Sequence, residues 1–143
     1  MKLFLLAFFT LLSIWPSALC RRDANSRFKL CCARQSMADQ TCKRRFCDFN
    51  SLSQDNILLF INLCSAKGNT VKDMWECASS KMDHTACCKR KNVPSECLKY
   101  CDYGKAPPPN DYLNHLLCLQ TFDKVKGCFK EHLDQHANIY GDF

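Results

Sequence analysis

Cysteine is the residue type whose number and spacing could do the most chemistry in this chain of 143 residues, which contains 13 cysteines. Thiols form disulfides when paired, and clustered thiolates bind zinc. The cysteines follow nearly the same spacing twice: an adjacent pair and then four single residues. The first series is Cys31, Cys32, Cys42, Cys47, Cys64 and Cys77, and the second is Cys87, Cys88, Cys97, Cys101, Cys118 and Cys128. We interpret the two series, residues 31–77 and 87–128, as an internal duplication.

Disulfide bonds explain this pattern better than a metal centre does. Structural zinc sites usually contain two cysteines separated by two residues, and no such C-x-x-C occurs in the sequence. Apart from Cys20, the cysteines form an even set of twelve, which predicts six disulfides and no metal or other cofactor. Adjacent cysteines are not expected to bond to each other, because that ring strains the peptide. The spacing leaves the pairing open, although a duplication predicts matched partners for matched cysteines.

The first twenty residues have the features of a secretory signal peptide. A short basic start is followed by an apolar run over residues 3–15 and by small residues before a cleavage position. No later stretch reaches the ~18 apolar residues that a membrane-spanning helix needs. We therefore expect residues 1–20 to be removed and residues 21–143 to form a single secreted, extracellular domain without a transmembrane segment.

Apolar residues recur at helical spacing, and alternating strand patterns are scarce. Residues 53–64 predict a helix that is apolar almost all round and should therefore be central. Other helices are expected to begin at Thr70 as a cap, at Ser95, at Asn110 or Asp111, and at Thr121. The last of these has an apolar stripe made of Phe122, Val125, Phe129 and Leu133. The predicted fold class is all-α and disulfide-rich, with two duplicated small units of about three helices each, stapled by six disulfides.

Asp83-His84 could supply a base and its orienting carboxylate in a hydrolase. Secreted phospholipase A2 places such a pair after adjacent cysteines, whereas here the pair precedes Cys87-Cys88. The glycine-rich loop that would hold a catalytic calcium ion is also missing from the sequence. We expect His84 to serve a turn or a helix start.

His132 and His136 are four residues apart and would share one face of the last helix. A zinc protease helix needs glutamate directly after its first histidine, and Leu133 stands there. We therefore expect a surface histidine pair and no catalytic residue.

Positive charge is concentrated at the start of the predicted mature chain. Residues 21–45 carry a net charge of +6, whereas residues 46–143 carry −1. Such a basic face could bind an acidic glycan, an anionic membrane or an acidic protein, or it could only keep the protein in solution. Nucleic acid is not expected for an exported chain. The candidate binding residues are Arg34, Lys43, Arg44 and Arg45, with Lys89, Arg90 and Lys91 at the equivalent place in the second half.

The twelve cysteines and the segments around them resemble the DB module, a twelve-cysteine extracellular domain known mainly from nematodes. The similarity covers nearly all of residues 21–143 and includes residues 83–88 and 93–97. The resemblance implies a secreted scaffold and brings no established activity, cofactor or catalytic residue.

Two classes of function remain open. We favour a secreted, non-enzymatic module that binds an extracellular protein or an acidic glycan. The alternative is a defence-type or toxin-like effector acting on membranes, which an exposed apolar patch beside the basic residues would favour. The apolar stripes also carry cysteines and should face the core, so the effector is second and a small secreted hydrolase is third.

Overall fold

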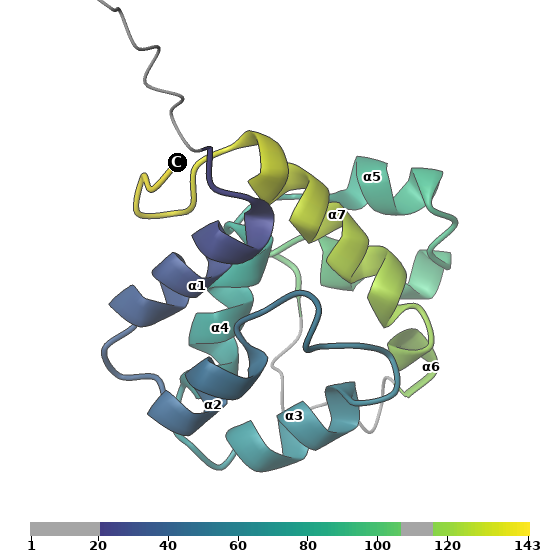
Figure 1. Cartoon of the computed structure of the whole chain (residues 1–143). Helices are drawn as coiled ribbons and strands as arrows, with labels where there is room; N and C mark the ends of the chain where they lie inside the picture. Colours follow the sequence, from purple (N-terminus) through teal and green to yellow (C-terminus); the bar gives the residue numbers. More distant parts are fainter. Residues whose placement is uncertain (1–20, 107–115) are drawn as a thin grey trace, which may run out of the picture.

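A computed structural model describes residues 21–106 and 116–143 (Figure 1). The predicted signal peptide and the predicted helix start near residue 110 lie outside this part of the chain. The described residues form helices and no strand, apart from an isolated antiparallel β-bridge between Asp83 and Asp102. The predicted all-α, disulfide-rich class is therefore confirmed.

Within the described residues, each half of the cysteine repeat contains four helical elements, one more than predicted. The first half supplies α1 (Ala24–Arg34), α2 (Gln40–Phe46), α3 (Ile57–Cys64) and α4 (Thr70–Ser79). The second half supplies α5 (Thr85–Arg90), the 3-10 helix η1 (Ser95–Cys101), α6 (Leu116–Leu119) and α7 (Phe122–Gln135).

Aspartate side chains fix the beginnings of the first two helices. Asp23 and Asp39 each accept a hydrogen bond from a first-turn backbone amide, at 2.8 and 2.9 Å, which satisfies a donor that the helix leaves unpaired. Thr70, predicted to cap α4, is instead its first residue. Its hydroxyl donates to the carbonyl of Lys67 at 2.6 Å and accepts from the Asp39 amide at 2.9 Å. Thr70 therefore ties α4 to the start of α2.

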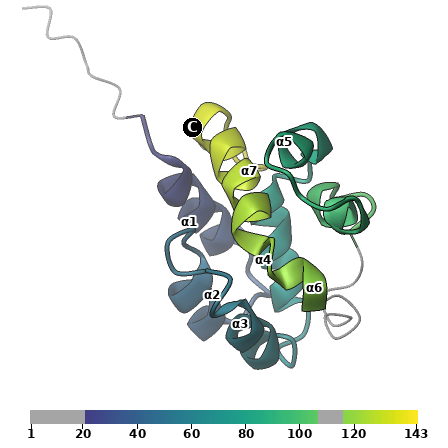
Figure 2. The same ribbon diagram turned by 90° about the vertical axis from the view of Figure 1, so that its right-hand side faces the viewer.

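One hydrophobic core serves both halves. Helix α7 packs against α1, α4 and α5, and both ribbon views show it crossing the molecule beside them (Figures 1 and 2). Its buried face contains the predicted Val125, Phe129 and Leu133. Phe129 contacts Trp75 of α4 edge to face, with ring centroids 5.1 Å apart. The halves are thus packed into one body, and the duplication remains an interpretation of the cysteine pattern.

Helix α3 ends at Cys64 as predicted, but it begins at Ile57 instead of residue 53 and is not central. Ile57, Phe60, Ile61 and Cys64 are buried, as the apolar spacing predicts. The opposite side carries exposed leucines at positions 58, 59 and 63, with exposed fractions of 39, 42 and 43%. The prediction of a central helix is therefore wrong, because no element within residues 21–106 and 116–143 buries these leucines.

The residues after α7 fold back over α1 and fasten it. The Asn138 side chain donates to the carbonyl of Arg27 at 3.0 Å, and Asp142 binds Arg34 at 2.7 Å. Arg27 is itself fully buried, and its guanidinium donates to the carbonyl of His136 at 3.0 Å. The C-terminal segment and α1 therefore hold each other through polar contacts, of which the Asn138 bond is buried and the Arg34–Asp142 pair is exposed.

Candidate interaction surfaces

All twelve cysteines of the repeat form disulfides, with Cα–Cα distances between 5.4 and 6.5 Å. The order of pairing is the same in both halves: first with sixth, second with fourth and third with fifth. The bonds are Cys31–Cys77, Cys32–Cys47 and Cys42–Cys64 in the first half, and Cys87–Cys128, Cys88–Cys101 and Cys97–Cys118 in the second. Neither adjacent pair bonds to itself. Matched cysteines thus have matched partners, which supports the interpretation of a duplication.

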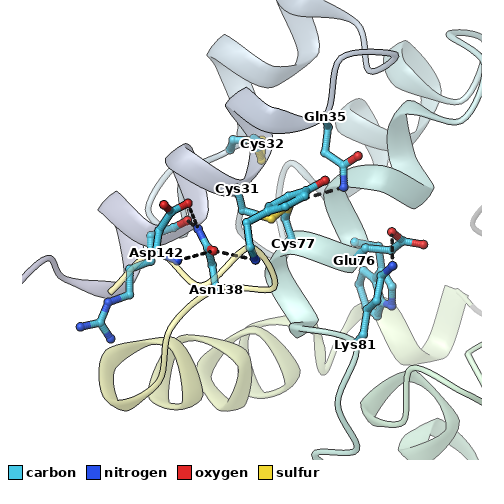
Figure 3. The surroundings of a disulfide bond; sticks show 12 residues. Cys31, Cys32, Gln35, Glu76, Cys77, Lys81, Asn138 and Asp142 are labelled. Carbon is cyan, nitrogen blue, oxygen red and sulfur yellow. Dashed lines mark hydrogen bonds and ion pairs between the residues drawn. A yellow bond between two sulfur atoms is a disulfide. The ribbon is translucent and has the colours of Figure 1, made fainter.

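None of these six disulfides joins the two halves. Apart from the continuous backbone, the halves are therefore held together by non-covalent contacts. Figure 3 shows the bond between Cys31 and Cys77, which connects α1 to α4. Asn138 and Asp142 of the C-terminal segment lie on one side of it, and Glu76 lies on the other. Both cysteines are buried, and Gln35 Nε2 lies 3.7 Å from Cys77 Sγ.

Glu76 of α4 is a buried carboxylate held by three donors. Its Oε1 accepts from Lys72 at 2.7 Å and from the Tyr103 hydroxyl at 2.6 Å, and its Oε2 pairs with Lys81 at 3.0 Å. Burial alone would raise the pKa of Glu76, but these hydrogen bonds and charges outweigh it and lower the pKa to about 2. Because Tyr103 follows η1, this site also connects the two halves.

The predicted basic residues of the first half separate into two kinds. Arg44 and Arg45 are exposed on α2 and form no ion pair within the described part of the chain. Lys43, expected to point outward, is buried with an exposed fraction of 8%, and its ammonium donates to the carbonyl of Gln35 at 2.9 Å. Arg34 is exposed but paired with Asp142 at 2.7 Å. Only two of the four predicted cations are thus available to a partner.

The basic residues of the second half lie elsewhere. Lys89 and Arg90 are exposed in the last turn of α5, and Lys91 pairs with Glu131 at 2.5 Å. Helices α2 and α5 lie at opposite ends of the molecule in both ribbon views (Figures 1 and 2). The structure therefore does not bring the two clusters onto one continuous face.

Three histidines meet beside α7, although the sequence predicts only a surface pair. The His132 and His136 rings stack with centroids 4.2 Å apart, and the His84 ring meets His132 edge on at 5.2 Å. His84 is buried at the start of α5, with its Nε2 2.6 Å from the carbonyl oxygen of Ser79, in agreement with a structural role. Burial, followed by the neighbouring histidines, lowers the pKa of His132.

Asp83, the possible partner of His84 in catalysis, is engaged locally. Its Oδ1 accepts from the amide and the hydroxyl of Thr85, at 2.9 and 2.5 Å. In residues 21–106 and 116–143, no group of three His, Cys, Asp or Glu side chains is arranged to hold a metal ion. The same residues contain no helix long and apolar enough to cross a membrane.

The exposed side of α3 is the surface feature that the sequence reasoning missed. The signal was present, because positions 59 and 63 lie opposite Ile61 on a helix of 3.6 residues per turn, and Leu58 lies at the flank of the buried side. Because both sides of this helix are apolar, the sequence predicts that both are buried. In the structure one side packs on the core and the other faces outward.

Comparison with known proteins gives one match. A family model, the DB module, matches residues 31–129, which is more than half of the chain and includes all twelve paired cysteines. No curated protein and no solved structure matches. The twelve-cysteine pattern and this match agree, and the chain belongs to the DB module family.

Proposed function

We propose that this protein is a secreted, non-enzymatic DB module that binds an acidic glycan or an acidic extracellular protein through α2. The observation that carries the proposal is the pair Arg44 and Arg45, exposed on a short helix and free of ion pairs within the described residues. Two unpaired guanidinium groups with planar donor sets suit sulfate and carboxylate acceptors.

The disulfide frame makes this pair a rigid binding element. Cys42 and Cys47, one on each side of the arginines, bond to Cys64 and Cys32. A backbone fixed on both sides loses little conformational entropy when a partner binds. The local excess of positive charge over residues 21–45 would also speed the approach of an acidic partner.

A non-enzymatic role is supported by what the most reactive side chains do. His84 and Asp83, the best catalytic candidates of the sequence, hold the turn between α4 and α5 through Ser79 and Thr85. Secretion is supported by the predicted signal peptide and by twelve paired cysteines, which persist in oxidising compartments.

Retention on a heparin matrix tests the proposal. We expect wild-type protein to be retained at low salt and released steeply as salt rises, because screening weakens exposed charge pairs. Arg44→Glu/Arg45→Glu should elute at clearly lower salt. Lys89→Glu/Arg90→Glu is the matched control, since it changes net charge equally at the other end of the molecule, and it should elute near the wild type. Equal losses in the two variants would mean that only net charge matters, and the α2 site would be rejected.

A second candidate function, contact with membranes, is favoured by a specific observation, the exposed leucines of α3. The side of α3 that carries Cys64 faces the core, as expected, whereas these leucines do not.

A further inference from the structure

Helix α3 presents three leucines to solvent, and we name Leu58, Leu59 and Leu63 the leucine face. Their exposed fractions are 39, 42 and 43%, and contiguous exposed apolar surface often marks an interaction site. Two more exposed leucines, at positions 116 and 117 of α6, have exposed fractions of 48 and 57%. Helix α6 and α3 lie in the same half of the molecule in both ribbon views (Figures 1 and 2). The two helices that carry these exposed leucines thus lie toward the same end of the protein.

Cations lie close to α3, on α2 and on the turn that follows α3. Helix α2 packs against α3 and is bonded to it through Cys42–Cys64. The Arg45 guanidinium carbon lies 5.1 Å from the ring centroid of Phe46, and that ring lies 5.1 Å from the ring of Phe60 in α3. The Arg45 guanidinium therefore lies over a ring that packs directly against Phe60 of α3. Lys67, three residues beyond the end of α3, is also exposed and unpaired within the described chain.

The helix that carries the leucine face is held at both ends. At its start, the Asn56 side chain accepts from the Ser53 amide at 2.8 Å and donates to the carbonyl of Ser51 at 2.7 Å. At its end, Cys64 is cross-linked to α2. The leucines are therefore presented on a fixed backbone, so that binding orders little besides their side chains.

We propose that the leucine face, with Arg44, Arg45 and Lys67 beside it, is a docking surface for an anionic lipid bilayer. Leucines at the depth of the acyl boundary and basic side chains at the level of the headgroups are the composition of peripheral membrane contacts. Protein partners are favoured by exposed Trp and Tyr, which this face does not contain, and Leu is under-represented among the residues that dominate such interfaces. The inference rests on the proposed function, because it uses the same arginines of α2.

Vesicle flotation tests this inference. Wild-type protein should float with phosphatidylcholine vesicles that contain about 30% phosphatidylserine and remain unbound with pure phosphatidylcholine, because the anionic lipid supplies the attraction for the basic residues. Leu59→Ser/Leu63→Ser and Arg44→Glu/Arg45→Glu should each weaken binding by about tenfold or more. Met82→Ser is the matched control for lost exposed apolar surface, since Met82 is 50% exposed on the turn before α5, and it should bind as the wild type does. Intact mass and circular dichroism would verify six disulfides and native helicity in each variant.

Three results would overturn the inference. They are absence of wild-type binding, unchanged binding of the leucine variant, and a wild-type dimer in solution that the leucine substitutions convert to a monomer, since a second copy would then cover the face. Heparin retention separates this failure from that of the proposed function. The leucine variant should keep its retention on heparin. If the wild type is retained on heparin through Arg44 and Arg45 but does not float with the vesicles, only the membrane surface is rejected and the proposed function stands.

Discussion

Single buried polar residues connect the two halves of this molecule. Arg27 of α1 reaches the carbonyl of His136, and Glu76 of α4 accepts from Tyr103. Burying a charge is costly unless partners compensate for it, and Arg27 is only partly compensated because its Nε and Nη2 have no hydrogen-bond partner in the described structure. The Phe143 ring, 4.3 Å from the guanidinium carbon, supplies a cation–π contact. These residues fix how the halves fit together at some cost in stability.

Glu76→Gln should destabilise the protein by roughly 2 kcal/mol at pH 7, because two lysines and a tyrosine lose a charged acceptor. The pKa of Glu76 falls from 4.5 to about 2 on folding, so the native state favours the ionised form. The stabilisation is present above pH 4.5 and is lost as the pH falls towards 2. Guanidinium unfolding midpoints of wild type and variant should therefore differ at pH 7 and converge at acid pH. A constant difference across this range would assign the effect to lost packing.

At the scale of secondary structure, α7 is the element on which both halves depend. It carries Cys128, which closes the second half, and its C-terminal turn supplies Asp134 to the first. Asp134 Oδ1 accepts from the backbone amide of Ala24 at 3.0 Å, so α7 caps the beginning of α1. A carboxylate at this position also opposes the positive end of the helix dipole, and its hydrogen bonds lower the pKa of Asp134 against the effect of burial.

Asp134→Ala should lower stability by about 1 kcal/mol, the usual cost of removing a capping side chain. Thermal unfolding followed by circular dichroism at 222 nm is the measurement. Glu131→Ala is the control on the same helix, because Glu131 is exposed and its pair with Lys91 should contribute less than about 0.5 kcal/mol. Similar losses in the two variants would contradict a capping role for Asp134.

Helices with a continuous apolar stripe can be predicted from the sequence. Helices that bury charged residues or cysteines, or that are very short, are not recognised by this criterion. The stripe of α7 is correct at Val125, Phe129 and Leu133. Helix α1 buries Ala24, Arg27, Phe28, Cys31 and Cys32, which has helical spacing, but a buried arginine and two cysteines conceal it. Helix α2 is too short to show a period, and α5 buries only Cys88.

The candidate surface was predictable only in part. Arg44 and Arg45 follow from the sequence as exposed cations. Lys43 does not, because its acceptor, the Gln35 carbonyl, comes from a neighbouring helix end. The exposure of the leucine face depends on how the other described helices pack, which no local pattern encodes. Local spacing thus gave the residue types, and tertiary packing decided which of them reach a partner.

At the scale of the whole molecule, disulfides act within each half and non-covalent contacts act between the halves. Three disulfides close each half, over separations of 13 to 46 residues, and none crosses between halves. The halves meet through one core and through the C-terminal segment that lies over α1. A half of about 60 residues is only marginally stabilised by the apolar surface that it can bury alone. The disulfides reduce the entropy of each unfolded half, while packing between halves supplies the common core.

Separating the halves should therefore prevent native folding, even though each would keep all its disulfide partners. We expect residues 21–82 and 83–143, oxidised separately in a glutathione buffer, to give mixed pairings, because α1 and α4 lose α7 and expose their apolar faces. Mass mapping of disulfides and circular dichroism measure the outcome. Refolding the two fragments together is the control and should restore a substantial share of the native bonds Cys31–Cys77 and Cys87–Cys128. If the first fragment alone regained its three native bonds and native helicity, the halves would be independent units, and the shared core would not be what specifies the fold.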